Sequence, residues 1–301
     1  MPDIPLNLAA DPESRRAYTL HSRAWLSNRY VYPVVSRRSK GISIGINLNP
    51  DKICNFDCIY CSVPRPEPLP PQPNIDMPLL RAELSEMLRL AASGDLYTLD
   101  PFDKIPGGLR RINDIAFSGD GEPTTCPQFS DACRLAAELK DAAHLREVKL
   151  VVITNATMFH RPAVQEALAF LDQHNGEIWA KLDAGTEAYY DLVDRTPVPF
   201  ARVLENLAWC TRTRPTVIQS LFMKVHGNPP PDEEIHAYVQ RLAEVAKTAE
   251  GTPGGIKLVQ LYTVARQTTE AYATPLTAGE LEGIRGHVTA TLPNTPVETY
   301  P

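Results

Sequence analysis

The run Cys54-Asn55-Phe56-Asp57-Cys58-Ile59-Tyr60-Cys61 governs the interpretation of this 301-residue chain. Its three cysteines lie within eight residues, separated by three residues and then by two. Three thiolates can hold three irons of a cubic iron–sulfur cluster and leave the fourth iron without a protein ligand. The spacing therefore predicts a metal centre at Cys54, Cys58 and Cys61 with one iron open for chemistry.

Two other roles for these cysteines are less well supported. A structural zinc site needs four ligands, usually as two Cys-x-x-Cys pairs, and the sequence offers no second pair. Three clustered cysteines cannot pair among themselves as disulfides, and residues 1–12 show no secretory signal. The other three cysteines are spaced too irregularly to hold a second cluster of the ferredoxin type; they are Cys126, Cys133 and Cys210.

The chain alternates short β-rich runs with amphipathic stretches. This alternation is typical of a parallel α/β architecture. We expect strands at residues 42–48, 114–118, 148–154, 177–182, 216–225 and 255–264. We expect helices at residues 78–92, 128–142, 162–174, 200–212, 232–249 and 278–292. Parallel barrels carry their chemistry at the carboxyl ends of the strands, so functional residues are expected in the loops after these runs.

The cysteine run resembles the hallmark of the radical S-adenosylmethionine (SAM) superfamily, in which an aromatic residue, here Tyr60, precedes the last cysteine. The resemblance implies a partial, TIM-like (β/α)6 barrel of parallel strands in residues 41–301, after an N-terminal extension of residues 1–40. It implies a [4Fe-4S] cluster whose open iron binds the methionine part of SAM. In that superfamily an electron from the cluster cleaves a carbon–sulfur bond of SAM and produces a 5'-deoxyadenosyl radical. The protein then supplies binding and orientation.

Within the superfamily, the chain resembles the branch related to tRNA wyosine-base synthases. The likeness lies in residues 45–48, 119–124 and 181–184. It implies an enzyme that abstracts hydrogen from an unidentified substrate, which is a small molecule, an RNA or a protein, and that receives electrons from a reductant such as flavodoxin or ferredoxin. The net charge of −6 gives no support to a broad nucleic-acid-binding face.

A glycine-rich segment, Ser118-Gly119-Asp120-Gly121-Glu122-Pro123-Thr124, follows the second expected strand. Glycines let a backbone approach a ligand closely, and a carboxylate can meet an ammonium group. Taken alone, the segment reads as an ordinary turn. One βα unit after the cysteines, it resembles the superfamily's segment for the methionine amino group. The resemblance implies a SAM site that includes Tyr60, Gly119, Asp120, Gly121 and Glu122.

Polar residues also end the third and fourth expected strands. At these positions side chains can reach ribose hydroxyls, a carboxylate or the substrate. Asn155 is expected to contact the cofactor. Lys181 and Asp183 alternate with Leu182, so both can face the barrel lumen and act in catalysis, with Asp183 also at the cofactor. A simple ion pair between the two is the other interpretation.

Three further features are less specific. Arg266 follows the sixth expected strand, and its planar guanidinium suits a carboxylate or phosphate of the cofactor. Cys126 lies just beyond the glycine-rich segment, where a thiol can donate a hydrogen atom in catalysis or serve as a small buried residue. The basic run at residues 37–40 can contact phosphate or form a solvated charged surface.

Composition favours an intracellular enzyme. No stretch reaches the ~18 apolar residues that span a membrane, so we expect no membrane association and a cytoplasmic location, where thiolates stay reduced. Two alternatives remain: an activase that installs a glycyl radical in a partner enzyme, and an iron–sulfur electron carrier or scaffold without a SAM pocket. A partner assay identifies the first, and substitutions at residues 119–122 would not affect the second.

Overall fold

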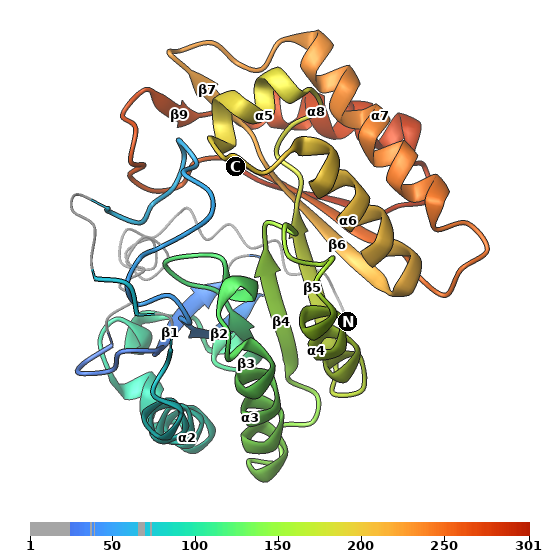
Figure 1. Cartoon of the computed structure of the whole chain (residues 1–301). Coiled ribbons are helices and arrows are strands. Elements are labelled where there is room, and N and C mark those ends of the chain that lie inside the picture. The colour runs from blue at the N-terminus through green and yellow to red at the C-terminus, as the bar shows by residue number, and fades with distance from the viewer. Residues whose placement is uncertain (1–24, 37, 39, 66–69, 73) are drawn as a thin grey trace.

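The computed structural model describes residues 25–36, 38, 40–65, 70–72 and 74–301. Eight strands form one curled sheet in the order β1-β2-β3-β4-β5-β6-β8-β10 (Figure 1). All neighbouring pairs from β2 to β10 are parallel, and β1 is antiparallel to β2. The strands are β1 (Val31–Ser36), β2 (Gly41–Ile46), β3 (Ile112–Phe117), β4 (Lys149–Thr154), β5 (Gly176–Lys181), β6 (Pro215–Leu221), β8 (Gly255–Tyr262) and β10 (Val297–Tyr300). The expected α/β partial barrel is confirmed.

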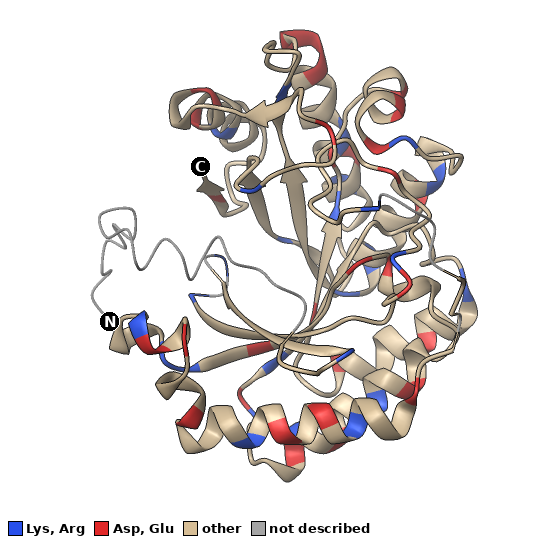
Figure 2. Ribbon diagram, turned by 90° about the vertical axis from the view of Figure 1, so that its left-hand side faces the viewer, with Lys and Arg blue, Asp and Glu red and all other residues tan. Residues whose placement is uncertain are grey.

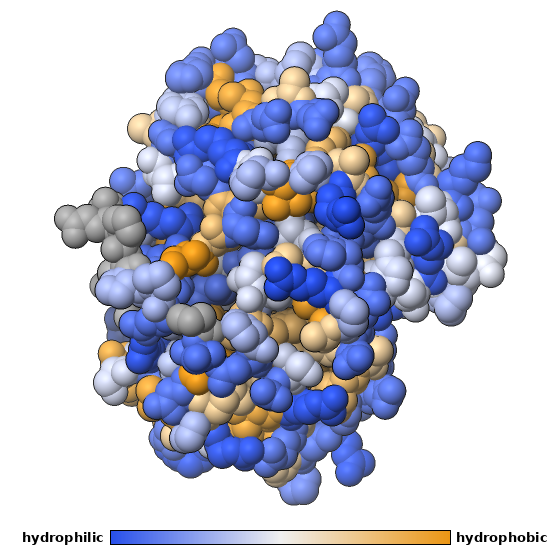
Figure 3. All heavy atoms as spheres, viewed as in Figure 1, coloured by the Kyte–Doolittle hydropathy of each residue, from blue (hydrophilic) through white to orange (hydrophobic). Residues whose placement is uncertain are grey.

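Helices cover the convex side of this sheet (Figures 1 and 2). They are α2 (Met77–Ser93), α3 (Phe129–Ala142), α4 (Pro162–Asp172), α5 (Glu187–Asp194), α6 (Phe200–Thr213), α7 (Asp232–Thr248) and α8 (Ala278–Thr291). All six expected helices are confirmed, and α5 is an additional one. Figure 2 shows most acidic and basic residues on the helices and loops, and Figure 3 shows a mainly hydrophilic surface on one face of the molecule. Among the described residues, no helix has the length and apolar character needed to cross a membrane.

The two faces of the sheet have different packing partners. Side chains alternate across a strand, so Ile178 and Ala180 of β5 pack in the main core, whereas Trp179 joins a small separate cluster with Ala116, Val151 and Val217. The separate cluster contributes Ala116 and Trp179 to the lining of a cavity on the concave side. The concave face of the sheet therefore carries apolar side chains next to the polar residues at the strand ends. We call this apolar cluster of Ala116, Val151, Trp179 and Val217 the apolar floor.

The sheet contains more than the six expected strands. β1 falls within residues 1–40, the range expected as an extension, and pairs along its whole length with β2. Pro33 weakens the strand signal of this segment, but an edge strand tolerates proline because its N–H can be spared. The structure describes residues 25–36, 38 and 40 of that range, and residues 1–24 lie outside the described chain. β10 is likewise additional.

The expected strand at residues 216–225 is divided in two. β6 ends at Leu221, and Phe222 donates its backbone N–H to the carbonyl of Tyr262 at 2.9 Å. The chain then leaves the main sheet, and β7 (Met223–Val225) pairs antiparallel with β9 (Ala273–Pro275). The sequence pattern is continuous across this break because both pieces are apolar and buried at their junction.

Glu83 of α2 fixes the start of the sheet. Its side chain is 7% exposed, and its carboxylate accepts backbone hydrogen bonds from Arg29, Tyr30 and Val31 at 2.8–3.0 Å. Arg29 and Tyr30 directly precede β1 and Val31 begins it, so the carboxylate satisfies backbone donors at the start of the strand. Helix α2 therefore fixes the backbone at the start of the edge strand β1.

Replacing Glu83 with Ala should lower the free energy of unfolding by about 2–4 kcal/mol, because three backbone donors, those of Tyr30 and Val31 buried, lose a charged acceptor. Urea unfolding followed by circular dichroism measures this loss. Glu86→Ala on the same helix is the matched control, because Glu86 is exposed and forms an ion pair with Arg89 on the helix surface. That control should change the value by less than about 1 kcal/mol, and equal losses in the two variants would refute the role given to Glu83.

Candidate active site

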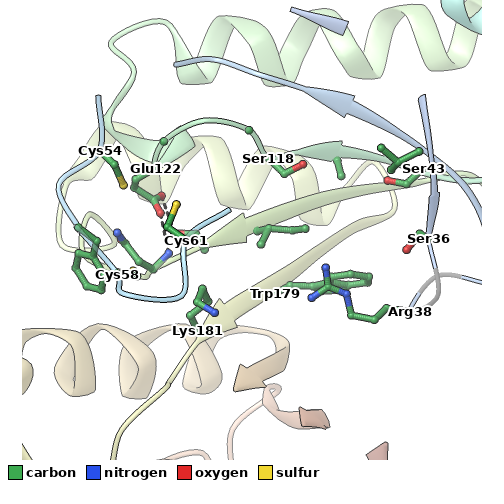
Figure 4. Close-up of a pocket in the computed structure, with 18 of the residues that line it drawn as sticks. Ser36, Arg38, Ser43, Cys54, Cys58, Cys61, Ser118, Glu122, Trp179 and Lys181 are labelled. Atoms are coloured by element: carbon green, nitrogen blue, oxygen red, sulfur yellow. Dashed lines mark hydrogen bonds between the residues drawn. The ribbon is translucent and has the colours of Figure 1, made fainter. Parts of the chain in front are cut away.

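The three clustered cysteines lie in the loop that follows β2, and all three line one cavity of about 270 Å³. The carboxyl ends of β3, β4 and β5 also contribute to its wall. We call it the cysteine cavity. Figure 4 shows Cys54, Cys58 and Cys61 at one end and Arg38 at the other, with Lys181 between them. The arrangement places the cysteines where parallel barrels carry their chemistry.

Contacts outside the sheet hold the cysteine loop in place. The backbone N–H of Asp57 donates to the carbonyl of Asp194 at 3.1 Å, and that of Ile59 donates to Val193 at 2.9 Å. The carbonyl of Cys61 accepts from the N–H of Thr269 at 2.8 Å. The C-terminal end of α5, the helix that sequence analysis missed, thus supports the middle of the loop.

Burial changes the acidity of the thiols. It raises the pKa of Cys54 to about 11 and the pKa of Cys58 well above the usual value. Thiolates are the metal-binding form, so these thiols need a strong positive charge nearby before they give up their protons. Burial also raises the pKa of thiols that have no function. What distinguishes Cys54 and Cys58 from such thiols is their place in the wall of a cavity.

Arg65 connects the loop to its surroundings through all three guanidinium nitrogens. Its Nη1 donates to Sγ of Cys61 at 3.1 Å, its Nε to the carbonyl of Lys52 at 2.8 Å, and its Nη2 to the carbonyl of Asp120 at 2.8 Å. The side chain therefore joins both ends of the cysteine loop to the glycine-rich segment. Sequence analysis did not find Arg65, because a single arginine beside a proline-rich stretch carries no recognisable signal.

Glu122 lines the cysteine cavity and is 3% exposed. Its Oε1 accepts from Thr154 Oγ1 at 2.7 Å and from the hydroxyl and backbone N–H of Thr124 at 2.5 and 3.1 Å. Its Oε2 accepts from the backbone N–H of Asn155 at 2.7 Å. Burial raises the pKa of this carboxyl, and these hydrogen bonds oppose the rise. Glu122 thus ties the glycine-rich segment to the end of β4.

The two glycines of the segment face the cysteine loop closely. A Cβ at Gly121 would lie 2.2 Å from the carbonyl oxygen of Ile53, and one at Gly119 would lie 2.3 Å from Oδ1 of Asn47. Both glycines line the cavity as well. The close approach seen here is to the protein's own loop, and the approach of these glycines to a ligand stays a prediction. Neither contact tolerates a side chain.

Asp120 and Asn155 differ in their relation to the cavity. The Asp120 carboxylate accepts from Nδ2 of Asn47 at 2.7 Å and does not line the cysteine cavity. Asn155 does line it, and its Nδ2 donates to Oδ1 of Asn55 in the cysteine loop at 2.8 Å. Asn155 therefore reaches the same cavity as the thiols, and Asp120 supports the loop behind them.

Lys181, Asp183 and Tyr60 form one buried network. Nζ of Lys181 lies 3.0 Å from Oδ2 of Asp183 and donates to the Tyr262 hydroxyl at 2.7 Å. The Tyr60 hydroxyl donates to Asp183 at 2.5 Å and to Asp194 at 3.2 Å. Lys181 and Tyr60 line the cavity, whereas Asp183 holds them from behind. The ion pair between Lys181 and Asp183 is present, and of the two only Lys181 lines the cavity. A catalytic role for either residue stays a prediction.

The network shifts the acidity of two of its members. Burial alone would lower the pKa of Lys181, but the negative charge of Asp183 outweighs it and raises that pKa. Lys181 therefore stays a cation. Burial beside Asp183 raises the pKa of Asp194 to about 8.

The two remaining candidates lie in different places. Arg266 lines the cysteine cavity. Cys126 is 7% exposed, packs in the main core and is not part of that lining. Burial raises the pKa of its thiol. The position of Cys126 favours a small packing residue over a hydrogen-atom donor.

Comparison with known proteins identifies the class of this chain. The model of the radical SAM superfamily matches residues 48–242, and the chain belongs to that superfamily. The family predicted from the sequence is confirmed. Its superfamily implies SAM and an iron–sulfur cluster.

Individual relatives are distant. The chain is 29% identical over 142 residues to a UPF0026 protein of Helicobacter pylori, a match that spans 46% of this chain and 39% of that protein. It is 26% identical over 145 residues to UPF0026 protein MJ1312 of Methanocaldococcus jannaschii, a match that spans 46% of this chain and 37% of that protein. It is 27% identical over 173 residues, 56% of this chain, to a protein named GTPase Obg in Brachyspira hyodysenteriae, of which it covers 21%. The chain thus spans well under half of each of these relatives.

Two solved structures share the fold. Streptococcus suis SuiB, in a structure bound to S-adenosylmethionine, superposes with a TM-score of 0.58 at 15% identity, covering 88% of this chain and 52% of that one. TYW1, in a structure with a lysine-pyruvate adduct, superposes with a TM-score of 0.50 at 14% identity, covering 93% of this chain and 81% of that one. At these identities the likeness concerns the fold.

Gly121→Ala should lower the free energy of unfolding by about 1–3 kcal/mol, because the added methyl group forces the glycine-rich segment away from the cysteine loop. Gly107→Ala is the matched control, because a Cβ there meets nothing within 4 Å. Urea unfolding of both variants tests the close approach. Equal stability of Gly121→Ala and the unmodified protein would contradict it.

Proposed function

We propose that this enzyme cleaves SAM reductively at a [4Fe-4S] cluster held by Cys54, Cys58 and Cys61, and that the resulting 5'-deoxyadenosyl radical abstracts hydrogen from a substrate. One observation carries the proposal. The three thiols, the glycine-rich segment and the end of β4 line a single cavity at the carboxyl ends of parallel strands. A reductant such as flavodoxin or ferredoxin would supply the electron.

The cysteines suit a cluster better than a single ion. Among the described residues, no three cysteine, histidine or acidic side chains are grouped to hold one metal ion. A cubic cluster does not need such convergence, because each thiolate binds a different iron. Three partly exposed thiols in one wall, with Arg65 donating to the third, fit a cluster with one iron facing the cavity.

The chain's own residues would orient the methionine end of SAM. Glu122 contributes a buried negative charge to the cavity, which favours an ammonium group. Because four donors hold this carboxylate, its place is fixed before a ligand arrives. Asn155 contributes to the same wall, next to the cysteine loop. The segment at Gly119 and Gly121 supplies backbone there.

Lys181 would bind anionic groups in the cavity. Its ammonium lies over the rings of Tyr60 and Tyr262, 4.9 and 5.1 Å from their centroids. Asp183 positions it, and Arg266 adds a second cation to the cavity wall. Cationic side chains at this place can hold anionic groups of cofactor or substrate and keep their orientation fixed during hydrogen abstraction.

Cys58→Ala should abolish both cluster binding and SAM cleavage, because it removes one of three iron ligands. The protein is reconstituted anaerobically with iron and sulfide and reduced with dithionite. After SAM is added, 5'-deoxyadenosine is quantified by mass spectrometry and iron by colorimetry. Cys133→Ala, in the core of α3, is the control that should keep both. Full iron content in Cys58→Ala would show that the ligand assignment is wrong.

Glu122→Gln should keep the cluster and weaken SAM binding by about tenfold, because the cavity loses a negative charge. Thr154→Val removes one donor to Glu122 and leaves that charge, so its effect should be smaller. Equilibrium dialysis with labelled SAM measures both. Unchanged SAM affinity in Glu122→Gln would remove this residue from the cofactor site, and the same loss in both variants would show that the residue acts only through loop geometry.

A further inference from the structure

A second cavity, of about 290 Å³, adjoins the cysteine cavity. The carboxyl-terminal residues of β5, β6, β8 and β10, together with the end of β1 and residues 263–266, form its wall. Six residues line both cavities: Ser36, Arg38, Tyr60, Cys61, Lys181 and Arg266. An occupant of the second cavity would therefore lie beside the cofactor site.

The two cavities differ in charge. Arg38, Lys181 and Arg266 line the second cavity, and among the residues that the structure describes no aspartate or glutamate is part of its lining. The cysteine cavity shares these cations but is also lined by Asp114 and Glu122. The chain as a whole carries a net charge of −6, so composition alone does not explain a wall whose described charged residues are all cations.

Arg38 is held by aromatic rings. Its guanidinium carbon lies 4.9 Å from the ring centroid of Tyr262 and 5.7 Å from that of Trp179. Within the described part of the chain, Arg38 has no ion pair or hydrogen bond. Figure 4 shows its side chain alongside Trp179. Ring faces fix the plane of a guanidinium and leave its N–H donors at the edge for a ligand.

Lys181 is fixed on the shared wall between the two cavities. Asp183 and the Tyr262 hydroxyl are its polar partners, and an ammonium has three N–H donors. Tyr262 thus contacts both Lys181 and Arg38. Asp183 compensates part of the charge on Lys181, and an anion beside Arg38 and Lys181 would be attracted by both cations.

We propose that the second cavity binds an anionic group of the substrate, a carboxylate or a phosphate, with Arg38, Lys181 and Arg266. SAM carries a sulfonium, an ammonium and one carboxylate, and its net positive charge suits the cavity with two carboxylates in its wall. The anionic substrate would take the cavity without them. This inference rests on the function proposed above, because it assigns a substrate class to the same active site.

Binding of small probes to the reconstituted holoenzyme with saturating SAM tests the proposal. The probes are phenyl phosphate, benzoate and the neutral benzyl alcohol, each titrated by anaerobic isothermal calorimetry. At least one anion should bind saturably, and its affinity should fall as salt is added. Benzyl alcohol should bind at least about tenfold more weakly, since it lacks the charge-assisted contacts. Whichever of phenyl phosphate and benzoate binds more tightly identifies the anionic group of the substrate as a phosphate or a carboxylate.

Variants locate the site. Arg38→Gln should weaken anion binding by about tenfold or more, because it removes a charged partner. Arg38→Lys keeps the charge but loses the planar fork, so its affinity should lie between those of Arg38→Gln and the unmodified protein. Arg89→Gln, on the exposed side of α2, is the control that should not change it. Arg38→Lys also keeps the test valid if Arg38→Gln fails to fold.

Three results would overturn the proposal: no saturable binding of either anion, equal binding of benzyl alcohol, or anion binding that is unchanged in both Arg38 variants. SAM cleavage is measured on the same samples to separate this proposal from the function. Cleavage without anion binding would reject only the anionic substrate. Anion binding that depends on Arg38, without cleavage, would leave the anion site standing and reject the proposed reaction.

Discussion

The close contact between the cysteine loop and the glycine-rich segment is the constraint on which the site depends. Gly119 and Gly121 lie against Asn47 and Ile53 with no room for a Cβ. Parallel pairing of β2 with β3 brings the two loops to the same edge of the sheet. Arg65 then joins them through hydrogen bonds at both ends of the cysteine loop. Strand order alone would place the loops near each other, and these contacts set their separation.

Charge is distributed unevenly along the lumen. Glu122 supplies a buried negative charge near the thiols, and its four hydrogen-bond donors hold it in place. Arg38 lies at the opposite end of the cysteine cavity, with Lys181 between (Figure 4). A ligand with both signs of charge would be oriented by such a gradient.

The fold and the centre of the site could be predicted from sequence because both depend on local patterns. Strand runs in parallel sheets are continuous and apolar, as the buried residues of β2 show, and the cysteine spacing is itself a local signal. The glycine-rich segment could be placed because it follows the next strand. Lys181 could be placed because side chains alternate along β5. The family comparison agrees with the expected superfamily.

The features that could not be predicted from sequence depend on contacts between parts of the chain that are far apart in sequence. Arg65 gains its meaning only when Lys52 and Asp120 are both near it. The edge strand β1 contains Pro33, which hides it, and the short helix α5 gave no periodic signal of sufficient length. Asp120 and Asp183 face their supporting partners and not the cavity, and sequence alternation does not resolve this difference.

The most direct test of the account is Mössbauer spectroscopy of the 57Fe-reconstituted protein with and without SAM. The account predicts a [4Fe-4S] cluster in which about one quarter of the iron signal shifts when SAM is added, because three irons are bound by cysteine and one is open. A spectrum that SAM leaves unchanged, or a centre with fewer irons, would contradict the claim that Cys54, Cys58 and Cys61 hold a cluster with a site for the cofactor.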